Sequence, residues 1–369
     1  MNELVDGVRE IVAREIAPRA AEVDLRGELP EGFALKLGER GLAGLALPEG
    51  YGGVGADLAT FGACLEALGG GCASSAWALV SHSGCARALL AFGADAQKER
   101  LLPALAAGRL LGSAMAGTEA AGGSSAAGTR TRARRDGDGW VLDGNKEFIS
   151  LAGLADLFLV MARTGDEPLA LGCFLVEKSD PGVSFGRREE LLGVRGLPVG
   201  GIGFAECRLP AERLLGAEAG GLAVMGAMGA WGLVGAAAAS LGIAAVALAD
   251  ATAYVKERVV AGASLSTLPG VQRALGELAF ELAGARAHLA QAIRDVEGVK
   301  GPPLPLFRAK LAATEAAVRI TDRAMALYGA AGYSRALPAE RRARDVRAFT
   351  IHFANNEVLK DMLSKAAVA

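Results

Sequence analysis

The chain has 369 residues, of which 51% are hydrophobic and 22% are charged. At roughly 100–200 residues per domain, this length predicts two or three packed units, and so high an apolar content excludes a disordered chain. The 39 lysines and arginines are balanced by 41 aspartates and glutamates, for a net charge of -2, which argues against a protein that binds nucleic acid by neutralising its phosphates. The five cysteines form no CxxC pair and the three histidines lie far apart, so we expect reduced, buried thiols and no metal site.

Residues 1–112 show the spacing of amphipathic helices. Val5, Val8 and Val12 recur at steps of three and four with charged residues between them, which predicts an N-terminal helical domain. A glycine-rich stretch at residues 48–55 predicts a loop that separates two groups of helices. The first residues alternate charged and apolar side chains, which is unlike a secretory signal, so we expect a cytoplasmic protein.

Residues 113–216 change to the pattern of β-strands. Two strand-like runs flank the sequence DGDG at residues 136–139, which predicts a hairpin. Further apolar or alternating runs bounded by Gly, Pro and Asp follow at residues 157–162, 172–177 and 201–206. Several strands at such short spacing predict a small β-barrel or sandwich as the central domain.

After residue 216 the helical pattern returns and continues to the end of the sequence, with breaks at residues 264–270, 298–305 and 329–338. Three breaks predict four long helices, so we expect residues 217–369 to form a C-terminal four-helix bundle. Residues 219–249 carry no charge and are long enough to span a membrane, but they are mostly Ala and Gly, whose drive for insertion is weak. We therefore expect a buried helix there, and an α+β protein overall.

Short motifs distributed along the chain resemble those of one known protein family. Residues 118–125 read TEAAGGSS where the family usually reads TEPGAGSD, and residues 144–150 read GNKEFIS where the family has GxKxWIT. Further matches are LGVRG at residues 192–196, YGAAGY at residues 328–333 and PAERRARD at residues 338–345. These motifs are similar to those of the acyl-CoA dehydrogenase family of flavoproteins, and they follow its order of helical domain, β domain and helical bundle. The resemblance covers essentially the whole chain and implies an FAD-dependent enzyme.

The resemblance assigns a set of residues to FAD. Glycine and small polar residues at 117–125 let backbone N–H groups approach a pyrophosphate, although taken alone this stretch is also compatible with a plain loop. By resemblance, Phe148 packs beside the flavin ring and Ser150 lies near its N5 atom. Arg258 would reach the pyrophosphate of a neighbouring subunit's FAD, although an arginine at a helix end is also often a solvated charge. The candidate FAD-binding residues are Met115, Thr118, Ser124, Phe148, Ser150, Arg258, Gly329 and Asn355.

The catalytic base of the family has no carboxylate counterpart at either expected position. Acyl-CoA dehydrogenation needs a group that removes the α-proton of the substrate while the β-hydrogen leaves as a hydride to flavin N5. In most members this base is a glutamate eight residues after the aspartate of an Arg-Asp pair, and here Phe353 follows Asp345 at that distance. Other members carry the glutamate on the first helix of the bundle, near the position of Gly232 or Leu233, within a stretch that here has no acid.

His352 and Glu357 are the remaining, weak candidates for a base. On a continuous helix they would point about 100° and 40° away from residue 353. We therefore expect His352 to serve in packing or hydrogen bonding and Glu357 to flank the flavin or solvent. The ring of Phe353 predicts an apolar pocket that accepts an aromatic or compact acyl group.

Three interpretations stay open. The first is a dehydrogenase of an acyl thioester, carried by CoA or by an acyl carrier protein, with a base from elsewhere or a substrate that needs less help. The second is an oxygen-using flavin monooxygenase on the same fold, and the third is a non-catalytic accessory subunit that pairs with a catalytic homologue. A contact of Arg258 with a neighbouring subunit implies a homodimer or homotetramer, and we expect neither a nucleic acid nor a membrane as a partner.

Overall fold

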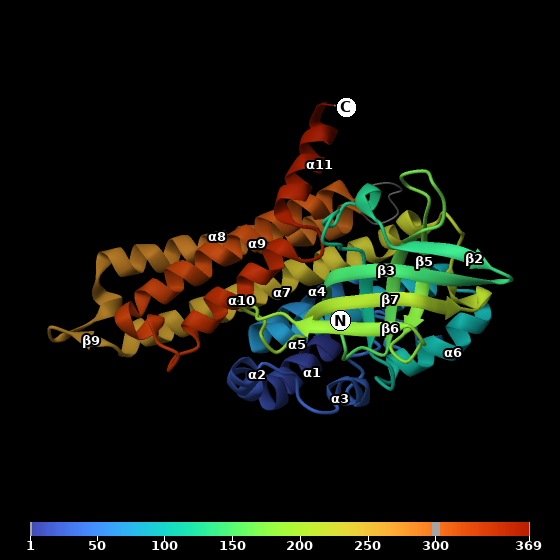
Figure 1. Ribbon diagram of the computed structural model, residues 1–369. Coiled ribbons are helices and arrows are strands. Elements are labelled where there is room, and N and C mark those ends of the chain that lie inside the picture. The colour runs from blue at the N-terminus through green and yellow to red at the C-terminus, as the bar shows by residue number, and fades with distance from the viewer. Residues whose placement is uncertain (1, 297–302, 369) are drawn as a thin grey trace.

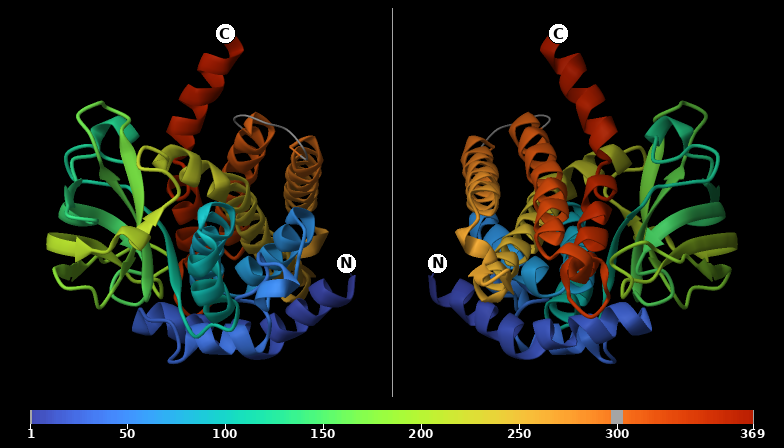
Figure 2. Two further views of the ribbon diagram at one scale, coloured as in Figure 1. Left: turned by 90° about the vertical axis from the view of Figure 1, so that its right-hand side faces the viewer. Right: turned by 90° about the vertical axis from the view of Figure 1, so that its left-hand side faces the viewer.

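The computed structural model describes residues 2–296 and 303–368, which form a helical N-terminal region, a central sheet and a set of long C-terminal helices (Figure 1). This arrangement confirms the α+β fold class. The sheet lies on one side of the central helices, and further C-terminal helices lie on the other side (Figure 2). All five cysteines are free and buried, as the sequence predicts.

The N-terminal region is helical, as its apolar spacing predicts. Its helices are α1 (Asn2–Ile11), α2 (Ala20–Arg26), α3 (Phe33–Glu39), α4 (Leu58–Gly71), α5 (Ala73–Phe92) and α6 (Asp95–Ala106). Turns around a short 3-10 helix at Glu49–Tyr51 separate α3 from α4, and Asp57 begins α4 by accepting a hydrogen bond from the backbone N–H of Thr60. Helix α5 is buried along most of its length because it lies between β1 of the sheet and helix α7 (Gly221–Glu257).

The central region is one eight-stranded sheet. Its strands are β1 (Gly112–Ala116), β2 (Arg132–Asp136), β3 (Gly139–Ser150), β4 (Leu157–Arg163), β5 (Leu171–Glu177), β6 (Val183–Arg188), β7 (Val199–Leu209) and β8 (Leu214–Leu215). They are ordered β6-β7-β3-β2-β4-β5-β8, and β1 pairs in parallel with β4. Strands β2 and β3 form the expected hairpin, with Asp136 paired to Gly139 across the turn.

The C-terminal region departs from four helices at its end. Among the described residues it contains α7 and four further helices: α8 (Pro269–Asp295), α9 (Leu304–Leu327), α10 (Ala339–Ile351) and α11 (Asn356–Val368). The last predicted helix is divided because Phe353 and Ala354 adopt left-handed φ angles of 51° and 79°, which an α-helix cannot contain. Helix α11 therefore leaves in a new direction and projects from the body of the molecule (Figure 2). The four-helix prediction was wrong at this position.

Small side chains let α4 and α7 pack with their backbones in contact. A Cβ atom on Gly69 of α4 would overlap the backbone of Ala239, and one on Gly242 of α7 would overlap the carbonyl oxygen of Glu66. This is the close helix packing that the abundant Gly and Ala allow. Helix α7 is long and apolar enough to cross a membrane, but 78% of its most apolar window is buried within the protein.

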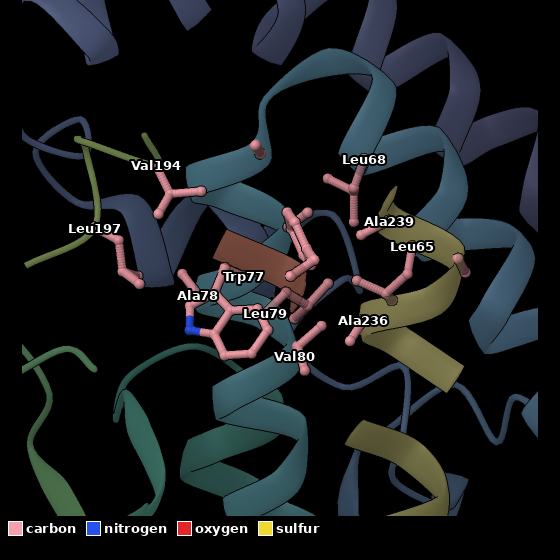
Figure 3. Packing of buried hydrophobic residues seen from close by; sticks show 14 of the residues in the cluster. Leu65, Leu68, Trp77, Ala78, Leu79, Val80, Val194, Leu197, Ala236 and Ala239 are labelled. Carbon is pink, nitrogen blue, oxygen red and sulfur yellow. The ribbon is translucent and has the colours of Figure 1, made fainter. Parts of the chain in front are cut away.

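The main core lies where α4, α5 and α7 meet. Leu65 and Leu68 of α4, Val80 of α5 and Ala236 of α7 belong to this buried cluster, and the Trp77 ring of α5 extends from it on another side (Figure 3). The core fixes α5 and α7 relative to each other, and both helices contribute residues to the site described next.

Candidate active site

A glycine-rich loop, residues 117–128, joins β1 to β2 and is fixed in place by Glu119. This buried carboxylate accepts hydrogen bonds from the backbone N–H groups of Arg130 (2.7 Å) and Thr131 (3.0 Å) and from Thr131 Oγ1 (2.7 Å). Nζ of the fully buried Lys146 in β3 lies 2.6 Å from Glu119 Oε1. Burial by itself would raise the pKa of Glu119, but the hydrogen bonds from Lys146 and Thr131 hold it below its ordinary value. The ionised pair thus ties the loop to the sheet.

Two hydroxyl groups lie on the exposed surface of this loop. Thr118 Oγ1 and Ser124 Oγ form a hydrogen bond of 3.0 Å. The carbonyl oxygen of Thr118 accepts a hydrogen bond from the backbone N–H of Glu147 at 2.9 Å, which brings the loop beside the end of β3. Gly123 has a φ of 58° and open space where a side chain would stand. The loop therefore offers hydroxyls and accessible backbone to a ligand.

The end of β3 presents Phe148 and Ser150 next to this loop. Phe148 has a φ of 53° at an irregularity in the pairing of β3 with β7, and 57% of its surface is exposed. Ser150 Oγ accepts a hydrogen bond from Trp77 Nε1 of α5 at 3.0 Å, and the Ser150 carbonyl oxygen accepts one from Ser113 Oγ at 2.7 Å. An uncovered aromatic ring thus lies two residues from a serine whose hydroxyl is held by α5 and whose carbonyl is held by β1.

Of the other FAD candidates, Met115 lies just before this loop, whereas Arg258 and Gly329 lie apart from it. Met115 belongs to β1, but its side chain is outside the described part of the structure. Arg258 follows the end of α7 and Gly329 follows α9, both exposed and at the end of the helical region that lies far from the sheet (Figure 1). Asn355 begins α11, where its Oδ1 accepts a hydrogen bond from the backbone N–H of Glu357 at 2.8 Å. One subunit therefore does not bring Arg258 or Gly329 to the glycine-rich loop.

The ring of Phe353 packs directly on Gly232 of α7. A Cβ atom on Gly232 would overlap three atoms of this ring, and one on Gly84 of α5 would lie 3.7 Å from the ring atom Cε2. The two positions at which the sequence resemblance expects a glutamate are thus in contact with each other in space. A phenyl ring and a glycine occupy them, and neither can accept a proton.

Lys310 of α9 holds the left-handed turn that carries Phe353. Its Nζ donates hydrogen bonds to the carbonyl oxygen of Ala354 and to Asn356 Oδ1, each at 2.7 Å. Asn356 Nδ2 in turn donates to Thr314 Oγ1 at 3.1 Å. Burial lowers the pKa of Lys310 to about 7, and the attraction of Glu315 opposes that shift. A neutral amine has two N–H donors, which match the two acceptors.

Neither weak candidate for a base is well placed. His352 lies against Trp77 with ring centroids 4.7 Å apart, and burial, with a smaller contribution from Lys310, lowers its pKa to about 4. Such an imidazole is neutral but weakly basic. Glu357 is exposed at the start of α11, and its Oε1 lies 2.9 Å from Lys360 Nζ. The directions expected for both residues assumed a continuous helix, which the break at residues 352–355 removes.

Sequence reasoning missed Trp77, Ser113 and Lys310. The signal for Lys310 was present, because it falls in a run of core-facing positions with Leu306 and Ala313 at helical spacing, where a lysine is exceptional. Trp77 and Ser113 carried no such signal, because their hydrogen bonds to Ser150 join residues far apart in the sequence.

The comparisons with known proteins all match the same protein family. Family models for the N-terminal, middle and C-terminal domains of acyl-CoA dehydrogenase match residues 1–109, 114–207 and 219–368. A probable acyl-CoA dehydrogenase of Mycobacterium tuberculosis, FadE25, is 34% identical over 99% of this chain and 94% of its own length. The structure of butyryl-CoA dehydrogenase from Megasphaera elsdenii superposes with a TM-score of 0.94 at 30% identity, covering 100% of this chain and 97% of the other. A glutaryl-CoA dehydrogenase from Mycobacterium smegmatis in complex with FADH2 superposes with a TM-score of 0.93 at 27% identity, covering 99% and 93%.

Proposed function

The chain belongs to the acyl-CoA dehydrogenase family, and from that premise we propose that it is an FAD-dependent oxidoreductase of an acyl thioester. The proposal rests on one observation: the exposed ring of Phe148 and the hydrogen-bonded hydroxyl of Ser150 lie at the end of β3, beside the loop that carries the hydroxyls of Thr118 and Ser124. The relatives named above are dehydrogenases, and they do not favour an oxygen-using enzyme or an accessory subunit.

The residues of the loop and of β3 fit a flavin. Phe148 offers an uncovered aromatic face, and the open backbone at Gly123 and the hydroxyls of Thr118 and Ser124 suit a pyrophosphate. Bound FAD supplies the acceptor for the hydride that leaves the β-carbon of the substrate. The ion pair of Glu119, which anchors the loop, keeps these groups in place before a ligand arrives.

Position 353 carries no carboxylate that could take the α-proton of the substrate. Phe353 packs against Gly232, so an apolar ring stands there in place of a group that could accept the proton. We propose a substrate with an aromatic or compact acyl group whose α-proton is acidic enough to pass to a water molecule, and from there to solvent, while the β-hydrogen leaves as a hydride. His352 packs against Trp77. Burial lowers the pKa of its imidazole, so His352 is a weak base and does not replace the carboxylate.

We propose that the active form is a homodimer or homotetramer. Arg258 and Gly329 lie far from the glycine-rich loop of their own subunit, so they can contribute to an FAD site only in a neighbour. Phe280 of α8 is 81% exposed, and an interface would cover such a ring. Light scattering of the FAD-loaded protein tests the assembly: a monomer that retains tightly bound FAD would contradict it.

Flavin binding tests the assignment of the site. We expect the purified chain to bind FAD, and Phe148→Ala to weaken FAD binding by tenfold or more, because the ring loses its stacking partner. Phe185→Ala, on β6, is the matched control, because Phe185 is likewise a partly exposed strand phenylalanine, and its ring packs against Phe158. Equal losses in the two variants, or no FAD binding by the wild type, would contradict the proposal.

A further inference from the structure

The hydroxyl of Ser150, at the end of β3, is held in one orientation by an indole ring. Trp77 Nε1 lies 3.0 Å from Ser150 Oγ. An indole N–H can only donate, so Ser150 Oγ is the acceptor of this bond and its own hydrogen points away from Trp77. In the part of the chain that the structure describes, Ser150 Oγ makes no other hydrogen bond. One O–H donor is therefore left for a ligand.

The backbone on both sides of this hydroxyl is fixed as well. Ser113 Oγ of β1 donates a hydrogen bond to the carbonyl oxygen of Ser150 at 2.7 Å. The next residue, Leu151, has a φ of 63°, and its N–H donates to the carbonyl oxygen of Pro198 at 2.6 Å. Ser150 itself is partly exposed. A ligand at the end of β3 can thus reach a hydroxyl whose position does not depend on that ligand.

The indole of Trp77 is itself confined. Only 3% of Trp77 is exposed, and its ring lies against Phe349 of α10 and His352, with centroid distances of 5.5 Å and 4.7 Å. The indole nitrogen is on the side of the ring away from Leu65 and Leu68 (Figure 3). A buried indole N–H needs an acceptor, and Ser150 Oγ supplies it. The N–H is therefore directed at Ser150 before a ligand binds.

We propose that Trp77 is a positioning residue for the flavin. Its N–H occupies the acceptor side of Ser150 Oγ and thereby directs the Ser150 O–H to the flavin ring. A hydrogen bond donated to an acceptor atom of that ring strengthens when electrons are added, so it favours the reduced flavin. Trp77 thus raises the reduction potential of bound FAD through Ser150. The inference rests on the proposed function, which places the flavin beside Phe148 at the end of β3.

The reduction potential of FAD bound to the chain, measured anaerobically against a reference dye, tests this inference. Ser150→Ala removes the donor, and we expect it to shift the equilibrium toward oxidised flavin by about tenfold, which is about 30 mV for a two-electron couple. Trp77→Phe keeps an aromatic ring but removes the N–H, and it should shift the equilibrium at least threefold in the same direction. The double variant should shift it no further than Ser150→Ala, because both changes act on one donor.

Two control variants separate this role from a structural one. Trp140→Phe makes the same change at a buried indole ten residues earlier, which packs against Phe174 and Arg135, and Ser150→Thr keeps the hydroxyl. Both should stay within about twofold of the wild-type equilibrium. A Trp77→Phe variant that is less stable but has the wild-type potential overturns the inference. Additive shifts in the double variant, or an equal shift in Trp140→Phe, also overturn it.

A second measurement needs no variant of Trp77. The chain has three tryptophans, so Trp140→Phe and Trp231→Phe identify the Trp77 indole N–H resonance in a nitrogen-labelled sample by elimination. We expect this resonance to shift when dithionite reduces the bound flavin, because the Ser150 hydroxyl that accepts from Trp77 also contacts the flavin. An unchanged resonance overturns the inference even where Trp77→Phe does not fold.

Failure of the inference can be told apart from failure of the proposed function. If the wild type binds no FAD, the proposed function is wrong and the inference falls with it. If an acyl thioester reduces the flavin while the potential is insensitive to Trp77, only the inference is wrong. If Trp77 and Ser150 set the potential together but no acyl thioester reduces the flavin, the inference stands and the proposed reaction is wrong.

Discussion

Replacing Gly232 by alanine tests the packing at the centre of the site. In the structure the added Cβ atom would overlap Cε1, Cζ and Cδ1 of the Phe353 ring, so the ring has to leave its position or α7 has to shift. The ring cannot move freely, because Lys310 holds the adjacent carbonyl of Ala354 at 2.7 Å. We therefore expect Gly232→Ala to destabilise the fold, although alanine is the better helix former.

The expected magnitude follows from two opposing contributions. Alanine in place of glycine inside an exposed helix stabilises it by about 0.5–1 kcal/mol, whereas overpacking a filled site costs about 1–3 kcal/mol. Gly229 is the matched control: it lies one turn earlier on α7 and has open space where a Cβ would stand. Gly229→Ala should raise the free energy of unfolding, and Gly232→Ala should fall below it by about 1–3 kcal/mol.

Urea unfolding of the variants measures this difference. The triple comparison of Gly232→Ala, Phe353→Ala and the double variant isolates the contact, because removing the ring should abolish most of the extra cost of the new Cβ. Equal stabilities of Gly232→Ala and Gly229→Ala would refute the placement of the ring. So would a cost of Gly232→Ala that persists unchanged when Phe353 is absent.

Three further changes probe the same site. Phe353→Glu restores a carboxylate at the contact with Gly232, and we expect the anaerobic rate of flavin reduction by a simple acyl-CoA to rise by about 10²–10⁴-fold; no rise would contradict the proposed geometry. The pKa of Lys310 is about 7 in the folded state and ordinarily about 10.4, so between these values the unfolded chain binds more protons and stability rises with pH. Lys310→Met should remove this pH-dependent contribution. Urea unfolding of wild type and variant at about pH 7 and about pH 10 measures the difference in their stability, which should shift in favour of the wild type at the higher pH. A difference that does not change with pH would contradict this expectation. Glu119→Gln leaves Lys146 charged and buried, so we expect a loss of about 3–5 kcal/mol in urea unfolding; an unchanged stability would show that the pair does not anchor the loop.

The sequence predicted those parts of the fold that depend on residues close together in the chain. The step of three and four at Val5 and Val8 predicts a helix because those positions share one face, and the DGDG turn predicts the β2–β3 hairpin because its residues suit a tight turn. The family motifs then carried the assignment of the loop at Thr118 to FAD. Each of these features depends on neighbours within a few residues.

The features that sequence reasoning missed depend on contacts between distant segments. The break after Ile351 requires left-handed φ angles at Phe353 and Ala354, residue types that seldom adopt them, and the hydrogen bonds from Lys310, 43–44 positions earlier, help to hold that turn. The contact of Phe353 with Gly232 likewise joins α7 to the turn after α10. Helical geometry applied to residues 352–357 could not anticipate a turn that another helix holds in place.

The most direct test of the account is an anaerobic titration of the FAD-loaded chain with a panel of acyl thioesters on CoA and on a carrier protein, followed at the flavin absorbance. We predict that at least one aromatic or compact acyl thioester bleaches the flavin and is converted into its α,β-unsaturated product. If no thioester bleaches the flavin, or if turnover requires O₂ and yields an oxygenated product, the assignment as an acyl thioester dehydrogenase is contradicted.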